Sequence, residues 1–220
     1  AEQQDLFENG FDMQYAWEGH HILNTIAKGK ANATKIISYL QKQDSIKNIP
    51  DIKMNFITNH DENSWSGTVK ERMGDASSLM TTLVYTLPGM PLIYSGQEYD
   101  LDYRLKFFEK DSIPKLKGAT WDLLEKLGTL KNNNTALNGG KNAANYSIFY
   151  TNNENILAFN RNKDETSIYF IGNLSNKIQT FSASLKGSFV DVLTNENIVL
   201  DTKKIELKPW EYYLLTKSQQ

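Results

Sequence analysis

The chain has 220 residues, of which 40% are apolar and 23% are charged, and its formal net charge at pH 7 is -2. This length allows a real hydrophobic core, and the composition excludes a disordered, collagen-like or coiled-coil protein. The small net charge offers no electrostatic basis for binding nucleic acid or an anionic membrane. The absence of cysteine excludes disulfides, thiolate catalysis and cysteine-bound zinc.

The amino-terminal part of the chain, residues 1–140, alternates short β-rich runs with amphipathic helical patterns, which is typical of consecutive strand–helix units around a parallel sheet. Three strands are expected, at residues 11–15, 54–58 and 91–96. Apolar side chains recur at helical spacing between and after these strands. The expected helices are residues 17–30 and 33–43, a segment N-capped by Asp75 that carries apolar residues from 79 to 87, and residues 121–131.

The remainder of the chain, residues 141–220, indicates an antiparallel β-sandwich. The domain boundary is expected at residues 132–140, a polar stretch rich in asparagine that ends in two glycines. Beyond it no helical pattern occurs, and β-rich runs alternate with turns of Asn, Asp, Lys and Gly. The expected strands are residues 146–151, 155–161, 166–173, 178–185, 189–193 and 205–215.

Polar side chains follow two of the predicted parallel strands directly. The segment Asn59 to Glu62 comes after the strand that ends at residue 58, and Gln97-Glu98 comes after the strand that ends at residue 96. Three parallel strands leave exposed edges, whereas eight strand–helix units close into a barrel with its functional groups at the carboxyl ends of the strands. The polar clusters are therefore predicted to lie on the rim of an active site.

Asn59, His60 and Asp61 suit a neutral ligand that carries many hydroxyl groups. Glycosidases hold sugar hydroxyls with short polar side chains, through hydrogen bonds that strengthen as the ring approaches an oxocarbenium ion. Asp61 could accept from two hydroxyls, His60 could donate to another, and Asn59 could orient a carboxylate from elsewhere in the protein. The alternative is that the trio caps the strand or forms an Asx-turn.

The segment Phe56-Ile57-Thr58-Asn59-His60-Asp61 resembles the fourth conserved region of the α-amylase family, glycoside hydrolase family 13, where Phe-x-x-Asn-His-Asp ends the seventh barrel strand. Gly10-Phe11-Asp12-Met13 resembles the family's sixth strand, and Gly89 to Glu98 resembles the segment through the eighth. The resemblance covers most of the chain. It implies an α/β plus all-β fold, with the last three strand–helix units of a (β/α)₈ TIM barrel in residues 1–140 and an antiparallel β-sandwich in residues 141–220.

By this resemblance the parent protein is expected to be a retaining hydrolase of α-1,4-glucans such as starch, glycogen or maltodextrins. Asp61 would stabilise the distorted sugar beside the scissile bond, and His60 would bind the same sugar. Family members that transfer glucosyl units, branch glucans or open cyclodextrins share Asn-His-Asp, so the exact reaction stays open. A non-catalytic carbohydrate-binding or scaffold protein is the alternative from another class.

The sequence departs from the family in its catalytic machinery. It has neither a Gly-x-Arg-x-Asp segment for the nucleophile strand nor the earlier Asp-x-x-x-x-Asn-His region. Retaining hydrolysis needs a nucleophile and an acid/base about 5 to 5.5 Å apart. The acid/base glutamate is expected just upstream of Ala1, with Glu2 as the alternative. We therefore expect the 220-residue chain to be inactive by itself.

Further side chains are candidates for sugar contacts. Asn59, Glu62, Arg104 and Tyr15 complete the predicted substrate-binding set with His60, although Glu62 could equally be a solvated loop residue and Arg104 part of an ordinary salt bridge. Aromatic rings that follow strands could also stack on glucosyl units, and core packing is the competing interpretation. These rings belong to Tyr15, Trp17, Trp65 and Tyr103.

No metal or cofactor is expected in this part of the protein. His20 and His21 are adjacent and point in different directions on a helix, which argues against a shared metal. Family members often bind calcium through an inserted domain nearer the amino terminus, so calcium is expected at most in the parent enzyme.

The expected partners are an α-glucan or maltooligosaccharide and the missing amino-terminal part of the barrel. Strands without opposing neighbours also make self-association an alternative. We expect no nucleic acid partner and no membrane-spanning segment, because prolines and a glycine interrupt the longest apolar region, residues 83–94. Residues 1–5 do not resemble a signal peptide. The family resemblance favours a secreted or periplasmic protein, with a cytoplasmic one as the alternative.

Overall fold

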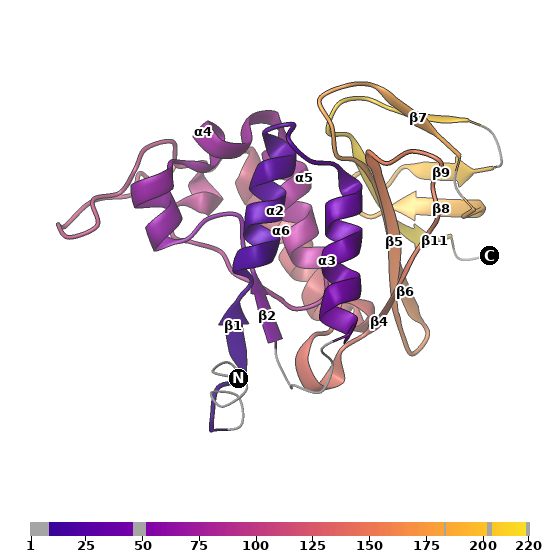
Figure 1. Cartoon of the computed structure of the whole chain (residues 1–220), viewed down its shortest axis with the longest axis horizontal. Coiled ribbons are helices and arrows are strands. Elements are labelled where there is room, and N and C mark those ends of the chain that lie inside the picture. The colour runs from indigo at the N-terminus through magenta and orange to yellow at the C-terminus, as the bar shows by residue number, and fades with distance from the viewer. Residues whose placement is uncertain (1–8, 46–51, 183, 202–203, 219–220) are drawn as a thin grey trace.

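The computed structural model describes residues 9–45, 52–182, 184–201 and 204–218. Within them the chain forms a helical part built on a small parallel sheet, followed by an antiparallel β part (Figure 1). The long helices lie side by side, and one of them, α3 (Ala33–Ser45), packs next to the large antiparallel sheet. Glu2 falls outside the described residues, so its predicted alternative role as the acid/base has no structural counterpart.

Three short strands form the parallel sheet in the order β1 (Met13–Tyr15), β2 (Ile52–Asn55) and β3 (Met90–Pro91). Both neighbouring pairs are parallel, with Tyr15 opposite Met54 and Met54 opposite Met90. Helices α2 (Trp17–Ala27) and α3 connect β1 to β2, and α5 (Ser77–Thr86) lies between β2 and β3. The predicted succession of three strand–helix units is present, while its place in an eight-stranded barrel stays a prediction.

The strands are shorter than their β-rich runs suggest. Each was expected to span five or six residues, whereas β1 has three, β2 has four and β3 has two, and β2 lies earlier than the expected strand at residues 54–58. Gly89 precedes β3 with φ +127°, and a Cβ atom there would lie 2.2 Å from the carbonyl oxygen of Lys53. Only glycine allows the backbone to approach β2 so closely.

One helix was missed and one cap was predicted wrongly. Helix α4 (Val69–Met73) begins with a capping box in which the Thr68 hydroxyl accepts from the Glu71 amide and the Glu71 carboxylate accepts from the Thr68 amide. The expected N-cap of α5, Asp75, instead lies in the single turn η2 (Gly74–Ala76). That turn runs directly into α5, so the Ser77 amide already donates to a backbone carbonyl and needs no side-chain cap.

The turn η3 (Gln97–Tyr99) follows β3, and the long helix α6 (Ala119–Asn133) comes after an extended loop. The β part then forms one six-stranded antiparallel sheet and one two-stranded sheet. In spatial order the large sheet consists of β4 (Asn145–Ile148), β5 (Ile156–Lys163), β6 (Thr166–Asn173), β11 (Tyr212–Lys217), β8 (Gly187–Asp191) and β9 (Asn197–Leu200). The small sheet pairs β7 (Gln179–Phe181) with β10 (Ile205–Leu207).

The strand expected over residues 205–215 is in fact two strands that belong to different sheets. Pro209 cannot donate to a ladder, and Trp210 has a φ of +59°, so the chain turns between β10 and β11. Strand β9 was not predicted, because its sequence carries only a short apolar run beside asparagine and glutamate.

Both faces of the large sheet are buried at β5 and β6. Alternate residues of β5, such as Leu157 and Phe159, join the helices in one hydrophobic cluster, while Ile156 and Ala158 face β7 and β10 in a second. The small sheet thus covers the face opposite the helices, as in a small sandwich. The helical part and the large sheet share one hydrophobic cluster, so side chains pack against each other across the predicted boundary at residues 140/141. That this boundary separates two domains stays a prediction.

A fully buried arginine reinforces this junction. Arg161 in β5 donates to the carbonyl oxygens of Thr86, at the end of α5, and Asn138, at distances of 3.0 and 2.7 Å. Burial lowers the pKa of Arg161 to about 10, so the guanidinium is still charged at pH 7. Its hydrogen bonds tie the helical part to the sheet.

Candidate active-site rim

The candidate site begins where β2 ends. Residues 55–59 are buried, and the chain then emerges at His60 and Asp61, whose side chains are 51% and 46% exposed. His60 Nε2 lies 3.6 Å from Asp61 Oδ2. The buried segment that continues β2 is followed abruptly by an exposed imidazole and carboxylate, which places both groups beyond the carboxyl end of the middle strand of the parallel sheet, the edge at which parallel α/β folds bind their ligands.

Asn59 shapes the turn that presents this pair. It is 1% exposed, its side-chain oxygen accepts from the Glu62 amide at 2.8 Å, and its carbonyl accepts from the Asn63 amide at 2.9 Å. These bonds start the π-helical turn η1 (Glu62–Ser66). Within the described residues, the side-chain Nδ2 of Asn59 and the hydroxyl of Thr58 are buried without a hydrogen-bond partner. Asn59 therefore forms the turn of the alternative interpretation through its side-chain oxygen. Its side-chain NH2 group has no hydrogen-bond partner among the described residues.

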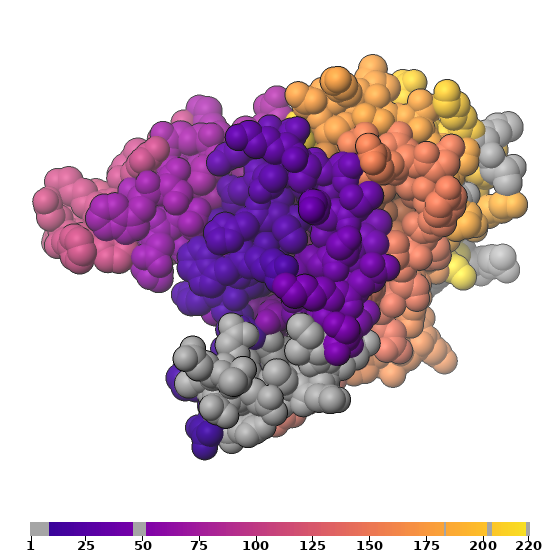
Figure 2. Space-filling view, viewed as in Figure 1, coloured from indigo at the N-terminus to yellow at the C-terminus, as the bar shows by residue number. Residues whose placement is uncertain are grey.

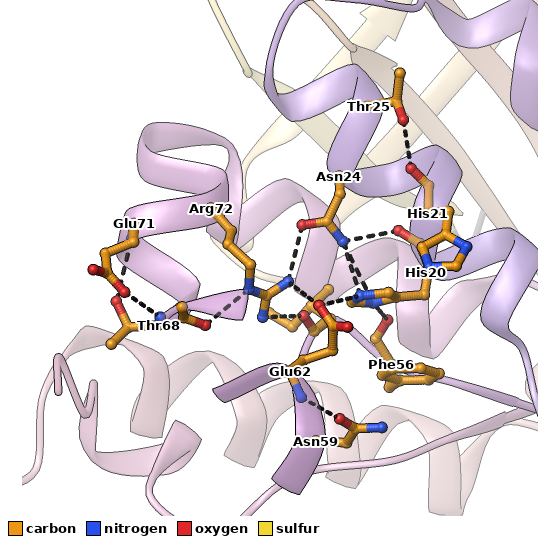
Figure 3. A network of polar contacts seen from close by, with 12 residues as sticks. His20, His21, Asn24, Thr25, Phe56, Asn59, Glu62, Thr68, Glu71 and Arg72 are labelled. Atoms are coloured by element: carbon orange, nitrogen blue, oxygen red, sulfur yellow. Dashed lines mark hydrogen bonds and ion pairs between the residues drawn. The ribbon is translucent and has the colours of Figure 1, made fainter. Parts of the chain in front are cut away.

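Glu62 points into a buried polar network with His20 and Arg72 (Figure 3). Its carboxylate lies 3.0 Å from His20 Nε2 and 3.6 Å from a guanidinium nitrogen of Arg72, and its side chain is only 15% exposed. Burial would raise the pKa of Glu62, but the hydrogen bond from His20 and the charges of His20 and Arg72 hold it below its ordinary value. Its predicted contact with substrate stays a prediction, and its carboxylate already has the His20 imidazole and the Arg72 guanidinium as partners.

His20 connects helix α2 to the strand exit. Its Nδ1 lies 3.2 Å from the Phe56 carbonyl oxygen and its ring stacks on the Phe56 ring with 4.4 Å between centroids. Asn24, one turn along α2, approaches His20 Nε2 at 3.0 Å. Burial lowers the pKa of His20 below its ordinary value, and the Glu62 carboxylate opposes this shift without overcoming it.

Arg72 in α4 closes the network. It donates to the carbonyl oxygens of Ile57 and Gly67 at 2.8 and 2.9 Å and to Asn24 Oδ1 at 2.9 Å. Burial lowers the pKa of Arg72, and the Glu62 charge opposes that shift. Residues from α2, η1 and α4 thus hold both ends of the segment that carries His60 and Asp61, from the carbonyl oxygens of Phe56 and Ile57 to Glu62. Sequence reasoning missed Arg72 and Asn24, because nothing in a lone arginine or asparagine indicates the partner it meets in the fold.

The fold has counterparts among known proteins, although no family model and no curated protein matches the sequence. A maltogenic α-amylase from Thermotoga neapolitana superposes with a TM-score of 0.80 at 20% identity, over 97% of this chain and 52% of that one. For an α-amylase from Lactobacillus plantarum the TM-score is 0.74 at 20% identity, over 98% and 50%. An α-amylase from Geobacillus thermoleovorans complexed with acarbose gives 0.74 at 14% identity, over 100% and 51%.

This chain has the fold of the carboxyl-terminal part of an α-amylase. It spans about half the length of the α-amylases that it matches. Identities of 14–20% establish a shared fold, and a fold alone does not specify a reaction. The family resemblance of the short sequence segments is thereby confirmed at the level of architecture.

Two further predicted residues of this α-amylase-like chain contact its own side chains. Arg104 forms an exposed ion pair with Glu71, whose carboxylate oxygens lie 3.0 and 3.2 Å from Arg104 Nε and Nη2. This contact is the ordinary salt bridge of the alternative interpretation. Tyr15, at the end of β1, meets Phe56 edge to face with 5.5 Å between ring centroids. The predicted sugar contacts of Arg104 and Tyr15 stay predictions.

The candidate aromatic rings divide into packed and exposed ones. Trp17 packs edge to face on Phe56 at 5.1 Å, which favours its core interpretation. The Tyr103 hydroxyl donates to the Ser112 carbonyl within the loop after β3. Trp65, in contrast, is 60% exposed on η1, four residues beyond Asp61.

The described residues contain no group of three or more His, Asp or Glu side chains suited to a metal ion. His20 belongs to the buried network, whereas His21 is exposed. Among the same residues, no helix combines the length and the apolar character needed to cross a membrane.

Proposed function

We propose that this chain is the carboxyl-terminal part of a retaining α-glucan hydrolase of the α-amylase family, glycoside hydrolase family 13, in which Asp61 and His60 hold the glucose unit beside the scissile bond. The observation that carries the proposal is the exposed His60–Asp61 pair at the exit of β2, in a chain with the fold of an α-amylase. Solved structures of this fold in complex with acarbose, maltose and maltotriose support an oligosaccharide as the ligand.

Asp61 has the chemistry that this role requires. Its carboxylate is about half exposed, and the ion pair it makes within the described part of the chain, with His60, is loose at 3.6 Å. Both oxygens can therefore accept hydrogen bonds from neighbouring hydroxyls of one sugar ring. As the ring flattens toward an oxocarbenium ion, positive charge grows beside the carboxylate, and the interaction strengthens in the transition state.

His60 completes the grip on the sugar as a hydrogen-bond donor, and Asn59 keeps the pair in place. The buried Asn59 side chain holds the turn through the Glu62 amide, so the two exposed groups project from a fixed backbone. Its unpartnered Nδ2 is a donor suited to a carboxylate oxygen, in line with the expectation that Asn59 orients a carboxylate from elsewhere. A preorganised donor and acceptor set is what favours a transition state over a ground state.

The proposal assigns cleavage to groups that this sequence does not supply. The chain has no segment that matches the family's nucleophile strand, and the acid/base is assigned upstream of Ala1. The 220-residue polypeptide is therefore proposed to bind α-glucans and not to cleave them. A longer parent sequence with both carboxylates would support the hydrolase, or a related transglycosylase, branching enzyme or cyclodextrinase. A parent without them would support the non-catalytic binding protein instead.

The test is a titration of the purified chain with maltoheptaose, followed by isothermal calorimetry or NMR. Binding is expected, and Asp61→Ala and His60→Ala should each lower the affinity at least tenfold. Asp75→Asn, which changes an exposed carboxylate on η2, is the matched control and should bind as the unaltered chain does. Equal affinity of all four proteins would remove the basis of the proposal. Release of reducing sugar by the purified chain would contradict its assigned inactivity.

The proposal also assigns a partner to the parallel sheet, namely the remaining strands of a barrel. Among the described residues, β1 and β3 each pair on one side only, and nearby Phe11, Met13 and Met90 are exposed. Sheet edges with exposed apolar side chains favour association. Analytical ultracentrifugation of the chain should show self-association that disappears when a polypeptide carrying the amino-terminal strands is added. A clean monomer in dilute solution would argue against this assignment.

A further inference from the structure

Three exposed aromatic rings form a continuous patch beside the candidate site. Trp65 on η1 and Phe107 and Phe108 in the loop after β3 are 60%, 39% and 85% exposed. Their ring centroids are 5.3 Å apart for Trp65 and Phe107, 6.3 Å for Trp65 and Phe108, and 4.8 Å for the two phenylalanines. Scattered exposed apolar residues are ordinary on protein surfaces, whereas a contiguous patch usually marks a binding surface. We call these three rings the aromatic platform.

The loop that carries the platform is fastened to the turn that follows Asp61. The buried side chain of Asn63 donates to the Tyr103 carbonyl at 3.3 Å and accepts from the Leu105 amide at 2.7 Å. The Ser64 hydroxyl donates to the Leu105 carbonyl at 2.7 Å. The loop forms the end of the molecule opposite the β part (Figures 1 and 2). These bonds hold the two exposed phenylalanines next to Trp65. Because the three rings are exposed, their arrangement does not serve to fill a hydrophobic core of this chain.

The platform adjoins the residues proposed to bind glucose. The imidazole of His60 lies 5.9 Å from the Phe107 ring, centroid to centroid. The patch therefore continues outward from the His60–Asp61 pair, along η1 and onto the loop. A ligand of several sugar units, held at Asp61, would cover these rings with its outer units.

The chemistry of the platform suits a neutral ligand with flat apolar faces. Residues 106–111 carry two basic and two acidic side chains, so their formal charges cancel, and Lys106 Nζ is paired with Glu109 at 2.9 Å. The CH groups of a pyranose ring form an apolar face that can cover an aromatic ring, and such rings provide contact area at little cost in conformational entropy. An anionic or cationic ligand would find no excess of opposite charge here.

We infer that Trp65, Phe107 and Phe108 form a stacking surface for glucosyl units beyond the one that Asp61 and His60 hold. This inference rests on the proposed function. It assigns to the platform a preference for longer oligosaccharides, because a chain of several glucosyl units covers more of the three rings than maltose does. Maltose and maltoheptaose are the probes that separate the two sites.

The experiment measures the affinity of the full 220-residue chain for both sugars. The unaltered chain should bind maltoheptaose at least tenfold more tightly than maltose. Phe108→Ala and the double change Phe107→Ala with Phe108→Ala should weaken maltoheptaose binding about fivefold and about tenfold, and leave maltose binding within twofold. Trp65→Phe keeps a ring in place and should bind nearly as the unaltered chain does. Tyr150→Ala, at an exposed tyrosine of the β part, is the matched control.

Each other outcome overturns a defined claim. If the unaltered chain binds neither sugar, the proposed function fails, and the platform fails with it. If the chain binds both sugars and the phenylalanine changes alter neither affinity, the platform is overturned while His60 and Asp61 stand. If maltose and maltoheptaose weaken equally in the phenylalanine variants, the rings act on the first glucosyl unit, and the extended surface is overturned.

Discussion

The two main sheets of the molecule differ in how completely the chain covers them. Strands β5 and β6 of the antiparallel sheet are buried on both faces, by the helices on one side and by β7 and β10 on the other. The parallel sheet has three short strands, with exposed apolar side chains at or beside it at Phe11, Met13 and Met90. Among the described residues, the buried polar atoms Thr58 Oγ1 and Asn59 Nδ2, shortly after β2, have no hydrogen-bond partner.

This difference suggests that the antiparallel sheet mainly contributes stability, whereas the segment after β2 contributes the proposed recognition of a ligand. Side chains that fill the antiparallel sheet gain free energy from burial, and their loss would leave cavities. His60 and Asp61 gain little from packing because their side chains are about half exposed, as their proposed contact with a ligand requires. Substitutions in the first region should therefore change the free energy of unfolding, and those on the rim should change affinity.

The largest effect is expected at the shared core. Phe159 is 1% exposed and stacks on Phe170 with 5.3 Å between ring centroids. Phe159→Ala should lower the free energy of unfolding by about 3–5 kcal/mol, because it removes a large buried ring and leaves a cavity. Urea denaturation measures this change. Tyr150→Ala, at an exposed position of the same part, should change it by less than about 0.5 kcal/mol. A loss below about 1 kcal/mol at Phe159 would mean that the core tolerates the cavity.

A somewhat smaller loss is expected when the polar network behind the rim is broken. Arg72→Met leaves Glu62 without one cation and the carbonyl oxygens of Ile57 and Gly67 without their donor. The free energy of unfolding should fall by about 2–4 kcal/mol. Lys70→Met, which removes an exposed ion pair with Asp102, should show no measurable change. If Arg72→Met were equally silent, the network would not hold the rim.

The same network predicts a dependence of stability on pH. The folded-state pKa of His20 lies below 6.5, so as the pH falls below 6.5 the unfolded chain binds the proton first and the free energy of unfolding decreases. The lowered pKa of Glu62 adds a further decrease below pH 4.5. Thermal melts between pH 2.5 and pH 8 measure both. His20→Gln should remove the part that begins near pH 6.5, and an unchanged profile would assign it to another group.

The smallest effect on stability is expected at the rim itself. Asp61→Asn should change the free energy of unfolding by less than about 0.5 kcal/mol, because the side chain is about half exposed and its ion pair with His60 is loose. The same variant should lose most of its affinity for maltoheptaose. Paired urea melts and titrations would measure both properties. A stability loss comparable to that of Phe159→Ala would show that Asp61 is a structural residue and would erase the contrast between the two regions.

Local patterns predicted much of the fold. Apolar periodicity located α2, α3, α5 and α6, and β-rich runs with turn residues located most strands of the large sheet. The Thr68-x-x-Glu71 capping box was visible in the sequence and would have revealed α4. The N-cap predicted at Asp75 was wrong because η2 leads directly into α5. The division of residues 205–215 between two sheets depended on a turn at Pro209 and Trp210.

The candidate site was predictable only in part, for a physical reason. His60 and Asp61 directly follow a β-rich run, so their position at a strand end depends on neighbouring residues alone. The roles of Glu62, His20 and Arg72 depend on contacts between α2, η1 and α4, which lie far apart along the chain, and one sequence does not reveal such contacts. The aromatic platform likewise joins η1 to the loop after β3, with α4 and α5 between them in the chain.

By itself, the sequence determined the order of helices and strands and the exposed pair at the end of β2, because periodicity and turn chemistry act between near neighbours. The tertiary structure decided which face of each strand is covered, where Glu62 points and which aromatic rings meet on the surface. These features arise from packing between distant segments, and burial and charge pairing are properties of the folded arrangement and not of any single stretch of chain.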